Sequence, residues 1–151
     1  MAMSPHPSPP PDKREFRAAR GEITVGYRSP FVVVSRVTGH FSADMQEWLL
    51  LSTKEVVARG TRLTLFHDWE AMTSYDSSVR QNLTTWSLEH RAQIASVHIL
   101  VRSKIVAMGV ATAGLALSLV GMRLHSYSAR AEFLTAVLAA TAKESASISI
   151  R

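Results

Sequence analysis

The sequence contains no cysteine in its 151 residues. This absence excludes disulfide bonds, thiolate metal sites and a cysteine nucleophile together. Phosphate-binding glycine patterns are missing as well, since neither G-x-G-x-x-G nor G-x-x-x-x-G-K followed by Ser or Thr occurs. A dinucleotide or P-loop nucleotide site is therefore not expected, and no cofactor is predicted.

A run of basic residues is also missing, although the formal net charge is +5. Residues 1–20 contribute four basic and two acidic side chains, and residues 21–151 contribute 13 basic and 10 acidic ones. In the body of the chain these charges stand singly, without the basic stripe that follows a phosphate backbone. A nucleic-acid partner is therefore not predicted.

The sequence predicts neither a signal peptide nor a stretch long enough to span a membrane. Residues 1–20 have no apolar centre and are rich in proline, so they are predicted to be a disordered leader. Residues 105–120 carry no charge, but 16 residues fall short of the roughly 20 that a bilayer requires. This stretch is rich in Ala and Gly and follows a strand directly, so it predicts a helix packed in the core. With the missing cysteines, these features indicate a cytoplasmic protein that does not span the membrane.

Patterns that carry catalysis or bind metals are missing too. The sequence has no G-x-S-x-G elbow to expose a nucleophilic serine, and no histidine pair spaced H-x-x-x-H. His67 and Asp68 form a weak polar cluster near the end of a predicted strand, where α/β proteins bind ligands. Neighbouring strand residues point to opposite faces, so these two side chains are not expected to converge. We therefore predict no catalytic residue, no metal site and no enzyme activity.

What the sequence does contain is an alternation of strand and helix patterns. Apolar, β-branched segments predict strands at 22–27, 31–37, 62–66, 96–101 and 121–125. Capping residues and 3.6-residue periodicity predict helices at about 44–59, from 76 onward, at 105–117 and after 128. In the last of these helices the side chains expected to point inward are Phe133, Leu134, Val137 and Leu138.

This order predicts one α/β domain over residues 21–145, followed by a short tail at 146–151. The first two strands are expected to form an antiparallel hairpin. Each later strand is reached through a helix and adds in parallel with a right-handed crossover. The expected architecture is a mixed, mostly parallel sheet of four or five strands with helices packed on it.

Three segments carry a resemblance to a known family: RLTLFHDW in the third strand, YDSSVRQNLTTW after it, and VHILVRSKIVAMGV further on. Over about residues 20–145 the chain resembles the STAS domain, the fold of bacterial anti-anti-sigma factors, and especially its SpoIIAA-like relatives of the STAS/SEC14 type. The resemblance implies a non-enzymatic regulatory module that binds another protein, such as a kinase or an anti-sigma-like regulator. The resemblance to the SEC14-type relatives implies an alternative function, that of a module that binds a lipid or a small apolar ligand.

In anti-anti-sigma factors the corresponding helix start carries Asp-Ser-Ser-Gly-Leu, whose first serine is phosphorylated. Asp76, Ser77 and Ser78 match this motif, while Val79 and Arg80 stand where the family has Gly and Leu. The resemblance implies that Ser77 is phosphorylated or contacts a partner, with Arg80 placed to pair with a phosphate. The residues alone also fit a plain helix start, with Asp76 as the cap and both serines in the first turn.

A second candidate site stands at the start of the apolar helix. Arg102, Ser103 and Lys104 follow a predicted buried strand. Ser103 can cap the helix, with Lys104 in solvent. The same three residues can instead form an anion site for a lipid head group or a phosphate at the amino end of the helix.

Overall fold

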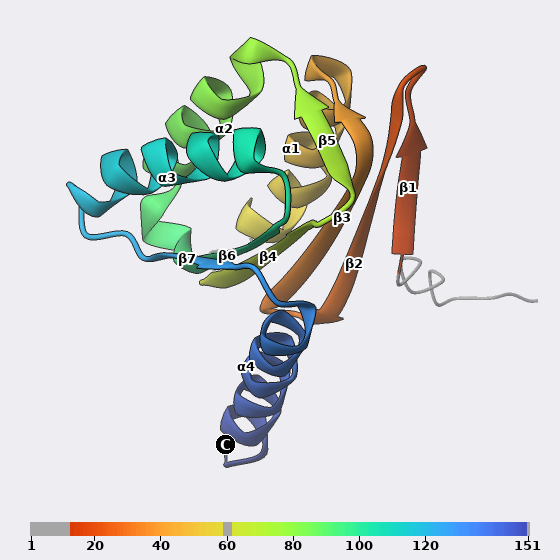
Figure 1. Cartoon of the computed structure of the whole chain (residues 1–151). Helices are drawn as coiled ribbons and strands as arrows, with labels where there is room; N and C mark the ends of the chain where they lie inside the picture. Colours follow the sequence, from red (N-terminus) through yellow and green to blue (C-terminus); the bar gives the residue numbers. More distant parts are fainter. Residues whose placement is uncertain (1–12, 59–61, 151) are drawn as a thin grey trace, which may run out of the picture.

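A mixed sheet of seven strands organises the chain (Figure 1). The computed structural model describes residues 13–58 and 62–150. The first three strands are antiparallel: β1 (Lys13–Arg17), β2 (Gly21–Ser29) and β3 (Val32–Phe41). Three more then add in parallel: β4 (Leu63–Trp69), β6 (Ile94–Val101) and β7 (Leu124–Tyr127). The short β5 (Met72–Tyr75) pairs in parallel with the end of β3.

Helices cover the two faces of this sheet unequally (Figure 1). One face carries α1 (Ala43–Ala58), α2 (Ser77–Glu89) and α3 (Lys104–Ser118), and the other carries α4 (Arg130–Ile150). A short 3-10 turn, Arg91–Gln93, precedes β6. Because strand side chains alternate, Leu65 belongs to the core under α1, α2 and α3, whereas Phe66 belongs to the cluster that packs against α4.

The predicted boundaries of the domain are wrong at both ends. β1 pairs with β2 along its whole length, and the ring of Phe16 stacks on Trp48 of α1 with centroids 5.8 Å apart. The last eight residues of the predicted leader therefore belong to the domain, and residues 1–12 lie outside the described residues. The charged sequence KREFR suits an exposed edge strand. At the other end α4 continues to Ile150, where a tail from residue 146 was predicted.

The predicted apolar helix is α3, but only one of its sides is buried. Val106, Gly109, Val110 and Leu117 are buried, and Ser103 caps the helix by accepting a hydrogen bond from the Val106 amide. The opposite side is exposed, so the prediction that the whole stretch packs in the core is wrong. Among the helices of the described residues, none has the length and apolar character needed to cross a membrane.

At its middle, α3 lies against the side chain of Tyr75 on β5. A Cβ atom on Gly109 would lie 2.5 Å from the Tyr75 hydroxyl and 3.4 Å from Cδ of Arg80 on α2. The first of these distances is shorter than any relaxed contact. Gly109 therefore sets how near α3 lies to β5 and α2.

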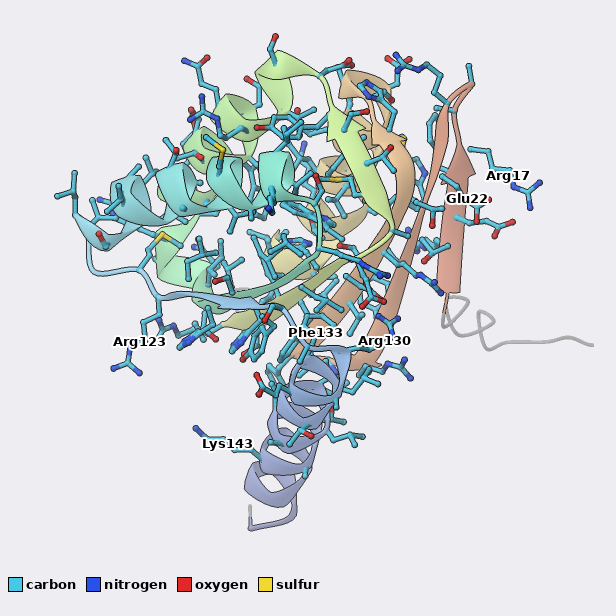
Figure 2. The ribbon with its side chains drawn as sticks, in the orientation of Figure 1. Arg17, Glu22, Arg123, Arg130, Phe133 and Lys143 are labelled. Atoms are coloured by element: carbon cyan, nitrogen blue, oxygen red, sulfur yellow. The ribbon has the colours of Figure 1, made fainter. Side chains whose placement is uncertain are left out.

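The fourth helix contacts the sheet through its first turns. Phe133 and Val137 are buried against the sheet, whereas Leu134 is 46% and Leu138 is 70% exposed. Arg130 at the first residue of α4 pairs with the buried Asp68 at 2.6 Å. Figure 2 shows Arg130 and Phe133 beside the sheet. The prediction that Leu134 and Leu138 point inward is wrong, because α4 packs on a single layer and buries only a narrow stripe.

Candidate functional site

The residues of the Asp-Ser-Ser motif lie at one corner of the domain, where β5 ends and α2 begins. Asp76 precedes α2 in extended conformation, but its carboxylate does not cap that helix. Its Oδ2 accepts a hydrogen bond from the amide of Ala43, the first residue of α1, at 2.8 Å. Asp76 therefore caps α1, and the prediction that it caps its own helix is wrong. Since β3 and β5 are parallel neighbours, the two helices that follow them start at the same edge of the sheet.

A chain of hydrogen bonds holds the Asp76 carboxylate in this position. Nε2 of His40 bonds to Oδ1 of Asp76 at 2.7 Å, and Nδ1 of the same ring bonds to Oγ of Ser74 at 2.7 Å. The hydrogen bond from His40 and then the one from the Ala43 amide lower the pKa of Asp76 below its ordinary value. The carboxylate thus stays ionised and fastens the starts of α1 and α2 to each other.

This use of Asp76 leaves the first turn of α2 without a side-chain cap. Ser77 and Ser78 are exposed, and within the described part of the chain their amides have no hydrogen-bond acceptor. Arg80 is also exposed and stands three residues after Ser77, on the same side of the helix. The corner therefore presents two hydroxyls, two free amide donors and one guanidinium to the solvent.

The second predicted cluster stands at the start of α3. Ser103 accepts a hydrogen bond from the Val106 amide at 3.4 Å, which is the capping role that the residues alone allow. Arg102 and Lys104 on either side of it are exposed. The structure holds no group that tests an anion site here, and that assignment stays a prediction.

His67 and Asp68 point to opposite faces of the sheet, as strand alternation predicts. Nδ1 of His67 bonds to Oγ of the buried Ser35 at 2.6 Å on the face covered by α1, α2 and α3. Asp68 is 5% exposed and binds Arg130 of α4 on the other face. The two residues therefore belong to separate environments and do not form a joint site.

A small apolar cavity lies between the sheet and helices α1, α2 and α3. Its volume is about 80 Å³, and most of the side chains around it are aliphatic. Trp69 lines it and is only 7% exposed, yet its indole Nε1 has no hydrogen-bond partner among the described residues. The ring of His67, another lining residue, stacks on Trp69 with centroids 5.3 Å apart. The only sequence signal for this pair is its i, i+2 spacing on β4.

Burial keeps two histidines of the sheet uncharged near neutral pH. Desolvation, and then the positive charge of His98, lower the pKa of His67 to about 4. Desolvation, and then His125, lower the pKa of His98 to about 4. His98 lies on the α4 side, where it stacks on Phe66 and its Nδ1 bonds to the Tyr127 hydroxyl at 2.8 Å. Both imidazoles are therefore neutral parts of the packed interior.

No protein-family model and no curated protein matches this chain. In structure the chain is similar to an uncharacterised protein of the DUF3478 family, with a SpoIIAA-like fold, from Shewanella loihica PV-4. The TM-score is 0.59, the sequence identity is 12%, and the likeness covers 81% of this chain and 98% of the other. The fold that the resemblance implied is confirmed, with seven strands where four or five were predicted. The chain is thus an α/β domain with the SpoIIAA-like fold.

Proposed function

We propose that this protein is a non-enzymatic regulatory module of the STAS/SpoIIAA-like type that binds another protein through the exposed start of α2. The observation that carries the proposal is the uncapped first turn of this helix, since the carboxylate of Asp76 is engaged at α1. Free amides at the positive end of a helix dipole favour an oxyanion. A carboxylate of a partner, or a phosphate on Ser77, meets that requirement.

Phosphorylation of Ser77 is the regulatory step in this proposal. A phosphate adds roughly two negative charges and three acceptor oxygens. At Ser77 it would lie near the unpaired amides of its own helix and one turn from the exposed Arg80. The domain tolerates the added charge there, so phosphorylation changes the surface offered to a partner, such as a kinase or an anti-sigma-like regulator, without unfolding the protein.

Ser77→Asp is expected to stay folded and to lose its partner. Aspartate at the first position of α2 is favourable for the helix dipole, so the melting temperature should change by no more than about 2 °C. Thr85→Asp is the matched control, because it adds the same charge at an exposed position two turns further along α2. In pull-downs from the source cells, wild type and Thr85→Asp should capture the same protein and Ser77→Asp should not. Equal capture by Ser77→Asp would contradict the proposal.

Asp76→Ala separates folding from binding at the same corner. Removing this carboxylate leaves the amide of Ala43 without its acceptor and frees the ring of His40. The melting temperature should therefore fall by roughly 3–6 °C, as for the loss of a helix cap. If Asp76→Ala shows this lower melting temperature and still captures the partner, Ser77 and Ser78 make the binding contacts and Asp76 does not.

A second candidate function, binding of a small apolar ligand, is favoured by the unpaired indole of Trp69 in the cavity. A buried donor without an acceptor costs free energy, and a ligand oxygen would satisfy it if the indole ring turns its Nε1 toward the cavity. An engineered cavity of about 150 Å³ holds benzene, so about 80 Å³ fits a group of only a few carbon atoms. We therefore propose a small ketone, aldehyde or alcohol as the class of ligand, and a lipid chain does not fit without a rearrangement.

Acetone, followed by the indole resonances of a ¹⁵N-labelled sample, tests this second candidate, because acetone is smaller than benzene. The chain has three tryptophans, which give three indole N–H signals. The signals of Trp69 and Trp86, which both line the cavity, should move on titration, and the shift should be larger at Trp69 because its N–H gains an acceptor. Isobutane, which has no oxygen, should not produce this larger shift at Trp69. An equal shift at Trp48, which does not line the cavity, or no shift at all, would rule out a specific cavity site.

A further inference from the structure

We propose that the outward side of α3 binds the surface of a membrane that contains anionic lipids, with the helix lying along the interface. Two independent features of the molecule support this. One is an exposed aliphatic stripe, and the other is the distribution of charge around it. Neither feature contributes to the partner site at the start of α2.

The stripe consists of large apolar side chains on the side of α3 that points away from the sheet. Five of the eight large apolar side chains exposed in the described residues belong to α3 and the two residues after it. Their exposed fractions are 68% for Ile105, 71% for Met108, 72% for Leu115, 87% for Leu119 and 47% for Val120. The spacings of three, seven and four residues from Ile105 to Leu119 keep these side chains on one side of the helix. The stripe runs roughly 21 Å along the surface at the helical rise per residue.

Exposed cations stand beside this stripe, in a stretch of chain without acidic residues. Residues 90–131 contain five basic residues and no acidic one, whereas the rest of the chain contains 12 of each. Of these five, Arg130 lies on the other face of the sheet and pairs with two carboxylates there. The other four form no ion pair within the described residues. Along the sequence these basic residues stand singly and form no basic stripe, and the missing acidic residues are the informative feature. Arg102 and Lys104 are exposed at the amino end of the helix. Arg123 is exposed just before β7, and Figure 2 shows it pointing to the side of this strand away from α3.

Two of these cations oppose the stability of the helix beside them. Arg102 and Lys104 stand at the amino end of α3, where the helix dipole disfavours positive charge. The first turn has no acidic residue, and neither cation forms an ion pair within the described part of the chain. Their position therefore gives the isolated domain no stabilisation that we can identify. An external anionic surface supplies the missing counter-charge.

The chemistry of the stripe fits a lipid surface better than another macromolecule. Its large side chains are aliphatic or methionine, with the small Thr112 between Met108 and Leu115, whereas protein interfaces are enriched in tyrosine, tryptophan and arginine at their centres. Single-stranded nucleic acid requires aromatic side chains for stacking, which the stripe lacks. A second copy of the chain would bring like charges together. An aliphatic stripe flanked by Lys and Arg is the pattern of a helix that lies on an anionic bilayer.

Sedimentation with lipid vesicles tests the proposal on the full chain. The protein should bind vesicles of phosphatidylcholine with roughly one third phosphatidylglycerol at least about tenfold more tightly than vesicles of phosphatidylcholine alone. Raising the salt to roughly 0.5 M should weaken the binding, because it screens the charges. Failure to bind the anionic vesicles would overturn the proposal.

Variants identify the surface that binds. Met108→Asp and Leu115→Asp should each reduce vesicle binding by about tenfold or more, since each places a charge where an apolar group enters the interface. Leu51→Asp is the matched control, because Leu51 is 60% exposed on α1, and its binding should equal that of wild type. Unchanged melting temperatures show that the variants are folded. Equal vesicle binding by wild type and Leu115→Asp would overturn the proposal. It would also be overturned if the protein does not bind vesicles and instead forms a dimer that Leu115→Asp dissociates.

Discussion

Val110→Asp is expected to remove a large part of the stability of the protein, whereas Ala111→Asp leaves it nearly unchanged. Val110 is 5% exposed on the inner side of α3 and belongs to the core. A charge there has no partner and no water, so its cost is about 3–5 kcal/mol, against a typical total of 5–15 kcal/mol. Ala111 is exposed, and Ala111→Asp costs only about 0.5 kcal/mol of helix propensity. Urea unfolding at neutral pH measures both values.

The two positions are adjacent and receive the same charge in the same helix, so the difference between them isolates burial. Equal and large losses would mean that both sides of α3 are packed and that its stripe is not exposed. Equal and small losses would mean that α3 is detached from the sheet. Either result would remove the structural basis of the proposed membrane surface.

Stability should fall as the pH is lowered from 6.5 toward 4, before most carboxylates titrate. The imidazole of His67 takes up a proton below pH 6.5 in the unfolded chain but only near pH 4 in the folded one. The unfolded state therefore binds more protons across this window, and folding loses roughly 2–3 kcal/mol from His67 alone. His98 adds a loss of the same sign, because its pKa is also lowered to about 4. Urea unfolding at roughly pH 7.5, 6 and 5 measures how the free energy of unfolding falls with pH.

His67→Gln assigns the slope to this residue. Glutamine does not titrate, and its amide can still form a hydrogen bond to the buried Ser35. The variant should therefore lose less stability than wild type over the same pH range, and the double variant with His98→Gln should lose less still. If the stability of wild type and of His67→Gln depends on pH in the same way, His67 takes up its proton at the same pH in the folded and the unfolded protein. Its burial is then incomplete.

The order of the main elements could be predicted because hydrophobic periodicity is a local property. Strands β2, β3, β4 and β6 carry apolar side chains in runs or in alternation, and α1 and α2 each begin directly after a polar residue. The two strands that sequence reasoning missed are β1 and β5, with the sequences KREFR and MTSY. Neither has a strong apolar alternation, and each forms because a neighbouring strand offers it a free edge.

The candidate site was predictable in its residues and not in its contacts. The position of Asp76 before a helix indicates a cap, but the helix that it caps starts 33 residues earlier in the chain. Only the pairing of β3 with β5 brings Ala43 to that carboxylate. For α3 the limit was different, because an uncharged helix is apolar on every side and its periodicity does not say which side is buried. The orphaned indole of Trp69 likewise depends on its surroundings and leaves no trace in the sequence.

The contact between Gly109 and Tyr75 joins the two proposed surfaces into one thermodynamic system. Tyr75 directly precedes Asp76 and Ser77, and its hydroxyl lies where any side chain at position 109 would stand. Packed interiors transmit displacement, so a shift of α3 on a bilayer displaces the residues that begin α2. Linkage is reciprocal: whatever factor a lipid surface applies to the affinity of the partner, the partner applies to the affinity for the lipid. The affinity of the domain for its partner protein would then depend on the lipid surface, and its affinity for the lipid surface would depend on the partner protein.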